Sequence, residues 1–289
     1  MGYAGRWRRA ELSEYVRAEL AFSETAYAKI NLALHVRKRR DYGYHEIETL
    51  FAFLDDGDHL TAHDSAEDRL SVSGEFAPDL DDPFGNIVSR ALTALPRAEG
   101  MAIDLEKRLP VAAGLGGGSA DAGAVFRLVE RSHGLPDDWH GRASRLGADV
   151  PACVESRSCI GRGTGTELTP IESDLSGVAV LLVNPRVSLA TRAVFSAWDE
   201  VDRGGLPGGS ASRIAREGRN DLEPAAISLC PAIADVLAAL HATDAFLARM
   251  SGSGATCFAL FRSHDAMREA AQRLASDHPG WWRMQGSLR

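Results

Sequence analysis

Cysteine and histidine patterns that bind metals or build disulfide networks are missing from this chain of 289 residues. Its four cysteines, Cys153, Cys159, Cys230 and Cys257, include no C-x-x-C pair, and its nine histidines include no H-E-x-x-H motif. These absences exclude the common zinc motifs and the disulfide framework of a small secreted domain. We therefore expect a cytoplasmic protein with reduced, buried thiols.

Positive charge and long apolar runs are also scarce. The chain has 32 basic and 40 acidic residues, a net charge of −8, which argues against a nucleic-acid partner because such proteins usually present a basic face. No apolar run is long enough to span a membrane. Residues 1–22 are polar and helix-prone and lack the apolar core of a secretion signal. We expect an N-terminal extension there and no membrane partner.

What the sequence does contain is a glycine-rich loop between a predicted strand, 101–107, and a predicted helix, 120–131. Glycines occupy positions 114 and 116–118. Glycine lets backbone N–H groups approach an anion, and a helix start carries roughly half a positive charge. No lysine follows the glycines as in a Walker A loop, and Ser119 replaces the third glycine of a Rossmann fingerprint. We predict a third kind of phosphate loop, with a plain connecting turn as the alternative.

Apolar periodicity predicts an α+β protein. The predicted strands are 27–36, 48–54, 59–62, 69–73, 101–107, 177–183, 246–250, 257–261 and one from 281 onward. The predicted helices are 87–95, with Asn86 as N-cap, 120–131, 139–146, 191–201, 231–241 and 264–275. Val150 is expected to be extended because proline follows it. A composition change around residues 169–176 predicts a domain boundary, with a split βαβ pattern after it.

A phosphate-transfer site needs a cation and a general base besides the loop. Lys29 and Asn31 share one face of the first predicted strand; the alternative is an exposed lysine on an uncovered sheet. Asp149 follows a predicted helix stop and is the candidate base, although the residue taken alone fits an ordinary turn aspartate better. Asp121 competes, but in the first turn of the predicted helix it would complement the helix dipole and repel phosphates. We therefore prefer Asp149.

Two further segments could line a ligand cleft. Tyr44 and His45 close a charged turn and could sandwich a flat heterocycle, or they could form a structural corner. The second glycine loop, residues 251–256, could face the same cleft from the second domain or close a tight hairpin.

Taken together, these segments resemble those of a known family. The residues at 110–119, PVAAGLGGGS, resemble the phosphate motif of the GHMP small-molecule kinases. Segments over almost the whole chain are similar to one branch of that family, the kinases of a cytidine-diphosphate-linked methylerythritol. They lie at 28–32, 41–45, 146–151, 161–165, 184–195, 220–222 and 251–256. The glycine motif indicates only the superfamily, whereas Lys-Ile-Asn, Gly-Tyr-His and Gly-Ala-Asp-Val-Pro together indicate the branch.

The resemblance implies an ATP-dependent kinase that phosphorylates the 2-hydroxyl of this substrate, a step of the non-mevalonate isoprenoid route. It implies Mg²⁺ as a cofactor. Asp149 would take the proton of the hydroxyl, and Lys29 would orient the hydroxyl and stabilise the nascent alkoxide. The implied ATP contacts are Pro110, Val111, Ala112, Ala113, Gly114, Leu115, Gly116, Gly117, Gly118, Ser119 and Ala120. The implied substrate contacts are Asn31, Tyr44, His45, Thr191 and Phe195, with Tyr44 and Phe195 near the cytosine ring.

The resemblance also implies two domains with the active-site cleft between them. A ribosomal-protein-S5-like ATP-binding domain would cover residues 23–175, and a ferredoxin-like domain would cover 176–289. A monomer and a homodimer both fit. Ala120 replaces the second serine that commonly follows the glycines, so any hydroxyl contact to the metal or the γ-phosphate would come from Ser119.

Two alternatives remain open at this point. One is another GHMP kinase, acting on homoserine, a mevalonate derivative or a sugar; Tyr44, His45 and Phe195 argue against it because those substrates have no base to stack. The other is a catalytically inactive nucleotide-binding paralogue, which the presence of both Lys29 and Asp149 disfavours.

Overall fold

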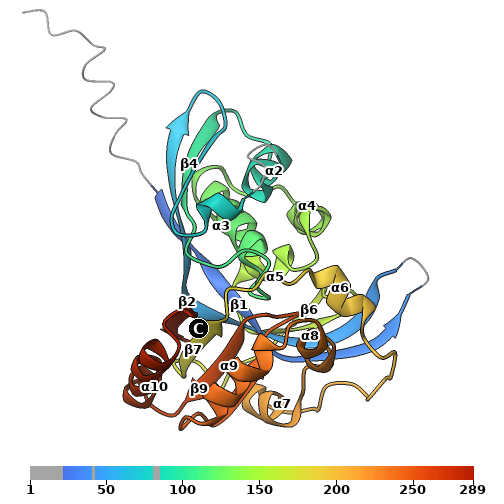
Figure 1. Cartoon of the computed structure of the whole chain (residues 1–289). Helices are drawn as coiled ribbons and strands as arrows, with labels where there is room; N and C mark the ends of the chain where they lie inside the picture. The colour runs from blue at the N-terminus through green and yellow to red at the C-terminus, as the bar shows by residue number, and fades with distance from the viewer. Residues whose placement is uncertain (1–21, 41–42, 81–84) are drawn as a thin grey trace, which may run out of the picture.

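Two β-sheets with helices packed against them make up the described part of the chain (Figure 1). The computed structural model describes residues 22–40, 43–80 and 85–289. The extension predicted over residues 1–22 lies outside the described residues, except for Phe22, which begins the first strand. The mixture of strands and helices confirms the predicted α+β class.

The first sheet has six strands in the order β3-β4-β2-β5-β6, with β1 paired to β2. These strands are β1 (Phe22–Arg39), β2 (His45–Ser65), β3 (Arg69–Ser73), β4 (Gly100–Glu106), β5 (Cys159–Arg162) and β6 (Glu167–Pro170). β3 and β4 pair in parallel, and the other pairs are antiparallel. A short 3₁₀ turn, η1 (Ala77–Asp79), follows β3.

Four helices accompany this sheet and lie on one side of β1, β2 and β4 in Figure 1. They are α2 (Ile87–Ala94), α3 (Gly117–His133), α4 (Trp139–Leu146) and α5 (Val150–Glu155). Asn86 caps α2 as predicted, because its side chain accepts a hydrogen bond from the Val88 amide at 2.9 Å. α3 packs against β1, β2 and α5, and its apolar stripe, including Val125, Phe126 and Val129, is fully buried. The sheet thus holds the glycine loop, which leads into α3, against β1.

The second sheet has four strands in the order β10-β7-β9-β8, all antiparallel. They are β7 (Ala179–Asn184), β8 (Leu247–Met250), β9 (Cys257–Phe261) and β10 (Trp282–Ser287). The helices are α6 (Thr191–Ser196), α7 (Ala211–Glu217), α8 (Glu223–Leu229), α9 (Ala232–His241) and α10 (His264–Asp277). Strand, helices, two strands, helix and strand follow one another as in the predicted split βαβ pattern. No helix in the described ranges is long and apolar enough to cross a membrane.

The two sheets share a core and are tied together at the end of the chain. Apolar residues of both, among them Ile30, Leu50, Val180 and Phe258, belong to one buried cluster. The Arg289 amide donates to the Phe53 carbonyl of β2 at 3.0 Å. Side chains from both halves can therefore meet at a fixed separation.

Two strand predictions are corrected by the structure. The predicted strands 48–54 and 59–62 are parts of the single strand β2. Gly57 does not turn the chain; a Cβ there would clash with the Ala26 carbonyl, so glycine is required by the close approach of β1. β1 is buried on both faces and has three register shifts, whereas the simple alternation of the sequence predicts one polar face.

The helix predictions need three corrections. Val150 is helical rather than extended, since Pro151 lies in the first turn of α5, where its missing N–H costs no hydrogen bond. α3 begins at Gly117, inside the glycine run. α6 ends at Ser196, short of the predicted residue 201. The short elements β5, β6, α5, α7 and α8 were not predicted, because each offers too few residues to show a period.

Candidate active site

Lys29 and Asp149 meet at the centre of the candidate site. The Lys29 ammonium lies 3.1 Å from the Asp149 carboxylate and donates to the Asn31 side-chain oxygen at 2.9 Å. The Lys29 side chain is 4% exposed and that of Asp149 is 32% exposed. The alternative of an exposed lysine on an uncovered sheet is therefore wrong, and the pair has one sheltered member and one that a ligand can reach.

Asn31 holds Lys29 through a chain of buried hydrogen bonds. Its side-chain nitrogen donates to the Thr49 hydroxyl at 2.8 Å, and Thr49 in turn donates to the Ala33 carbonyl at 2.7 Å. The amide oxygen is thereby turned toward the ammonium, which needs acceptors when it is buried. β1 thus carries both Lys29 and Asn31, the residue that orients the Lys29 ammonium.

Asp149 owes its availability to its position at the N-cap of α5. An N-cap aspartate usually accepts hydrogen bonds from amides of the first helical turn. Here no side-chain cap bond forms, and the backbone of Asp149 is already in the right-handed helical region at φ −85° and ψ −12°. The carboxylate is consequently left to face Lys29.

The glycine loop passes directly beside this pair. Gly114 and Gly116 have φ of +76° and +63°, a region that favours glycine. A Cβ on Gly116 would lie 2.9 Å from the Lys29 Cε and 3.8 Å from an Asp149 oxygen. The first helical bond of α3 runs from the Ala120 amide to the Gly116 carbonyl at 2.7 Å. The amides of Gly117, Gly118 and Ser119 precede that bond and are available to an anion.

Within the predicted phosphate segment, residues differ in what they face. Pro110, Ala113, Leu115 and Ala120 are buried and pack into the interior. Ala112 and Gly118 are exposed, and Val111, Gly114, Gly116, Gly117 and Ser119 are partly exposed. The loop is therefore anchored by its buried apolar side chains, and the backbone of its glycines is accessible from outside.

The second glycine loop lines the same site. The Ser251 hydroxyl accepts from the Asn31 amide at 3.2 Å and donates to the Gly114 carbonyl at 2.9 Å. The Thr256 amide donates to the Ala113 carbonyl at 3.1 Å. Both readings of this segment hold: it joins the antiparallel strands β8 and β9 as a hairpin loop, and it contacts the first glycine loop from the second half of the chain.

Aromatic residues gather at one end of the β1–β2 hairpin. The His45 ring lies 5.0 Å from Phe195 and 5.7 Å, edge-on, from Trp198. Burial, and next the charge of Arg39, lower the pKa of His45, so its imidazole is neutral near pH 7 and carries one donor and one acceptor. Tyr44, the preceding residue, is 63% exposed. Trp198 was not predicted, although it follows Phe195 at a helical spacing of three residues.

Thr191 connects this aromatic group to the second glycine loop. Its hydroxyl lies 3.0 Å from the Ser253 hydroxyl. The predicted substrate residues Asn31, His45, Thr191 and Phe195 thus come from β1, β2 and α6 and converge on one region.

Asp121, the competing candidate for the base, belongs to a different cluster. It lies beyond the first turn of α3 and is buried, with one oxygen 2.7 Å from the Lys107 ammonium. Lys107 also binds Asp58. The predicted dipole role is wrong: the partner of Asp121 is Lys107. Burial, partly offset by Lys107, raises the pKa of Asp121 from 3.8 to about 7.

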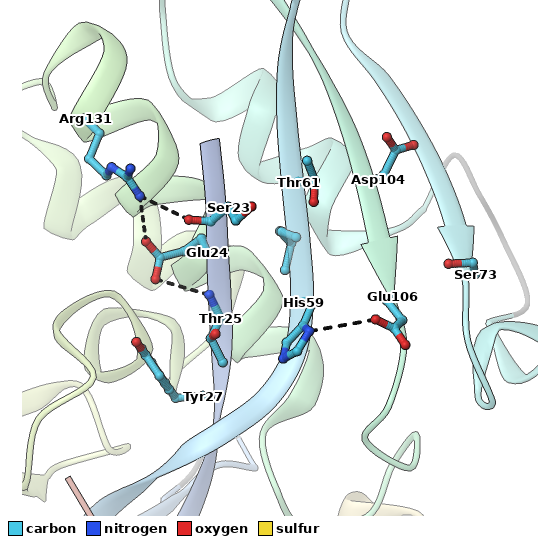
Figure 2. A pocket seen from close by; sticks show the side chains of 11 residues that line it. Ser23, Glu24, Thr25, Tyr27, His59, Thr61, Ser73, Asp104, Glu106 and Arg131 are labelled. Carbon is cyan, nitrogen blue, oxygen red and sulfur yellow. Dashed lines mark hydrogen bonds and ion pairs between the residues drawn. The ribbon is translucent and has the colours of Figure 1, made fainter. Parts of the chain in front are cut away.

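A separate pocket of about 610 Å³ lies on the first sheet, where Figure 2 shows it. Its lining includes Glu24, Tyr27, His59, Glu106 and Arg131. None of the residues predicted for the site lines it. It is therefore distinct from the candidate active site.

Comparison with known proteins places the chain in a family. Residues 86–157 match the N-terminal domain of the GHMP kinases, and residues 206–280 match their C-terminal domain. The chain is 66% identical over 270 residues to the 4-diphosphocytidyl-2-C-methyl-D-erythritol kinase of Novosphingobium aromaticivorans, covering 93% of this chain and 94% of that protein. It is 44% identical over 293 residues to the kinase of the same name from Rhodopseudomonas palustris, covering 93% and 98%.

Solved structures agree with this relationship. A crystal structure of 4-(cytidine 5′-diphospho)-2C-methyl-D-erythritol kinase superposes with a TM-score of 0.78 at 32% identity, over 92% of this chain and 99% of that one. A homoserine kinase from Cytophaga hutchinsonii, at 18% identity and a TM-score of 0.68 over 93% and 95%, shares the fold. The chain belongs to the 4-diphosphocytidyl-2-C-methyl-D-erythritol kinase family of the GHMP kinases.

Proposed function

We propose that this protein transfers the γ-phosphoryl group of ATP to the 2-hydroxyl of 4-diphosphocytidyl-2-C-methyl-D-erythritol, with Lys29 and Asp149 as the catalytic pair. The reaction is a step of the non-mevalonate route to isoprenoid precursors. The observation that carries the proposal is the 3.1 Å contact of Lys29 with Asp149 directly beside the left-handed Gly116 of the loop. The substrate assignment is supported by the names of relatives up to 66% identical.

The chemistry assigned to the pair follows from its geometry. As the substrate oxygen attacks the γ-phosphorus, its proton passes to the Asp149 carboxylate, and the bond from that phosphorus to the β,γ-bridging oxygen breaks to release ADP. Lys29 stabilises the charge that develops on the attacking oxygen. Phosphoryl transfer asks for positioning and electrostatic support more than for covalent help. A buried ammonium and a partly exposed carboxylate on opposite elements supply both.

ATP would bind along residues 110–120. The free amides at the start of α3 and the positive end of its dipole suit the phosphates. The glycines of the loop let the phosphates reach the backbone, and the nearby Lys29 supplies a local positive charge although the chain as a whole carries −8.

The cytidine end of the substrate would lie against His45 and Phe195, with Tyr44 closing over the base. The rings of His45 and Phe195 are 5.0 Å apart and tilted by 37°, a packing suited to aromatic contact. Neutral His45 can either donate a hydrogen bond to a cytosine acceptor or accept one from the cytosine amino group. Asn31 and Thr191 would contact the remainder of the substrate.

Mg²⁺ fits this site as an ion carried mainly by ATP. Among residues 22–40, 43–80 and 85–289, no group of three or more His, Cys, Asp or Glu side chains could hold a metal. Mg²⁺ commonly binds through substrate phosphates, waters and few protein ligands. The Ser119 hydroxyl, in the first turn of α3, would be the protein ligand. When bound, the ion neutralises phosphate charge.

Two further assignments complete the proposal. The first domain would cover residues 23–175 and the second 176–289, since the first sheet ends at Pro170 and the second begins at Ala179. The four cysteines are free and buried, which supports a place in the reducing cytoplasm.

An assay of ADP release with ATP, Mg²⁺ and 4-diphosphocytidyl-2-C-methyl-D-erythritol tests the function. We expect turnover on the order of 1–100 per second and competitive inhibition by cytidine diphosphate. Homoserine, mevalonate and galactose serve as control substrates. Turnover of a control substrate without inhibition by cytidine diphosphate would assign another GHMP kinase, and ATP binding without transfer to any substrate would indicate an inactive paralogue.

A further inference from the structure

One arginine joins the three elements that carry the parts of the proposed site. Arg127, in the middle of α3, donates through Nε to Glu24 at 3.1 Å and through Nη2 to the Thr25 carbonyl at 2.7 Å, both on β1. Its Nη1 reaches the end of α5, where it lies 2.6 Å from the Cys153 carbonyl, 3.3 Å from the Val154 carbonyl and 2.9 Å from the Ser156 hydroxyl. β1 carries Lys29, Asp149 is the N-cap of α5, and α3 begins inside the glycine run of the phosphate loop.

We propose that Arg127 is a positioning residue that sets Asp149 against Lys29. It touches neither the reacting atoms nor the loop, and it acts through α5. This inference rests on the proposed role of Asp149.

α5 needs such support because its own sequence holds it weakly. The helix has six residues and no side-chain N-cap bond. Short helices are unstable on their own, and the last carbonyls of any helix lack partners within it. The helix ends at Glu155, and its C-cap Ser156 lies in the left-handed region at φ 46° and ψ 42°. Arg127 donates to the Cys153 and Val154 carbonyls, the first of which also accepts from the Ser156 hydroxyl at 2.6 Å, and it places a positive charge at the negative end of the helix dipole.

A second arginine, Arg289 at the C-terminal end of the sequence, contacts the same end of α5. Arg289 donates to the Ser156 carbonyl at 3.1 Å and stacks on the Tyr27 ring of β1 at 3.5 Å. Arg127 lies 5.3 Å from the same ring. α5 is thus fixed at its C-terminal end, while its N-cap, Asp149, faces Lys29. A shift of about 1 Å in a reacting group costs on the order of 10²-fold in rate.

The test compares Arg127→Met with Arg131→Met, one helical turn later on α3. Arg131 pairs with Glu24 at 3.7 Å and donates to the Ser23 carbonyl at 3.1 Å, as Figure 2 shows, and it makes no hydrogen bond or ion pair with α5. We expect Arg127→Met to lower kcat about 10–100-fold with little change in the KM for ATP. Arg127→Lys should restore little, because lysine lacks the planar fork. Arg131→Met should stay within about twofold of the wild type.

A double-mutant cycle with Asp149→Asn separates positioning from general stabilisation. If Arg127 acts through Asp149, adding Arg127→Met to Asp149→Asn lowers kcat little further. Turnover is normalised to sites that bind a fluorescent ATP analogue, so that unfolded protein does not count. Should Arg127→Met fail to fold, Ser156→Ala, which removes the hydroxyl that accepts from Arg127 and donates to the Cys153 carbonyl, enters the same cycle with a smaller expected loss.

Equal losses of kcat in the two backgrounds, or a wild-type kcat in Arg127→Met, would overturn the positioning role. An inactive wild type would refute the proposed function instead, and unchanged turnover in Asp149→Asn alone would refute the role of Asp149. The three failures are therefore distinguishable.

Discussion

Two buried lysines lie close to neighbouring glycines of one loop, and they differ in the number and exposure of their carboxylate partners. A Cβ on Gly116 would lie 2.9 Å from the Lys29 Cε, and a Cβ on Gly117 would lie 3.3 Å from the Lys107 ammonium. Lys29 has one carboxylate partner, Asp149, whose side chain is 32% exposed. Lys107 has two, Asp58 and Asp121, whose side chains are 0% and 4% exposed.

This difference in exposure distinguishes a cluster with a structural role from a pair that can take part in catalysis. The closed cluster of Lys107, Asp58 and Asp121 fixes the entry to the loop, since Asp58 accepts the amides of Arg108 at 2.6 Å and Leu109 at 2.7 Å. No substrate can reach it. The open pair of Lys29 and Asp149 lies where the loop presents its glycines. A buried lysine beside a carboxylate is therefore not enough to indicate catalysis; one partner must also be accessible.

Replacing Asp149 should have the largest effect on activity. Asp149→Asn keeps the shape of the side chain but cannot take the hydroxyl proton, so we expect kcat to fall by about 10²–10⁴-fold while the affinity for ATP is retained. Steady-state kinetics and nucleotide titration measure the two quantities. Asp121→Asn is the matched control in the closed cluster and should retain far more turnover. Equal losses in the two variants would abolish the distinction between the clusters.

Replacing Lys107 should have the largest effect on stability. Lys107→Met removes the cation from two buried carboxylates, and loss of one partner of such a cluster costs about 3–5 kcal/mol. Lys29→Met should cost less, because the carboxylate it leaves can be reached by water, and should instead abolish most turnover. Urea unfolding of both variants and the wild type gives the two free energies. A larger loss in Lys29→Met than in Lys107→Met would contradict this ranking.

The two glycines provide a smaller contrast. Gly116→Ala places a side chain at φ +63° against Lys29, and the left-handed backbone alone costs roughly 1–2 kcal/mol. Gly117 is the first residue of α3, where alanine is a better helix former by about 1 kcal/mol, which offsets the crowding of Lys107. Unfolding free energies should therefore fall clearly only for Gly116→Ala. A comparable loss at Gly117 would show that the closed cluster tolerates no displacement.

Much of this site was open to prediction from the sequence because its signals are local. The glycine run marks the phosphate loop, the helix stop at Gly147 marks Asp149, and period-two spacing places Lys29 beside Asn31. The α10 helix was predicted for the same reason, since the apolar period of its buried residues, among them Met267 and Leu274, is long and regular.

The closed cluster and Arg127 could not be predicted because their contacts are remote in sequence. Lys107 and Asp58 are 49 residues apart, and Arg127 reaches 102 residues back to Thr25. Without the fold, Asp121 has no visible partner, so its apparent place at a helix start suggested a dipole role. The sequence also cannot show that Gly57 serves a close approach of strands rather than a turn.

The smallest expected effect is a dependence of stability on pH that only the closed cluster should show. Burial above all raises the pKa of Asp121 from 3.8 to about 7. The folded protein then holds a proton that the unfolded chain has released, so this contribution to stability is complete below pH 3.8 and is lost as the pH rises through about 7. The melting temperature of the wild type minus that of Asp121→Asn should fall between about pH 5 and pH 8.

Asp138→Asn is the control for this measurement. Its hydrogen bond from Arg142 lowers the pKa of Asp138 on the surface, so its contribution is already constant in that range. A difference for Asp121 that stays flat would mean that Lys107 keeps the Asp121 carboxylate ionised. The closed cluster would then carry a net negative charge beneath a loop that binds phosphates, and Lys29 alone would have to offset it. Burial would then not make Asp121 inert by keeping it protonated. The contrast between the two clusters would rest only on whether a substrate can reach them.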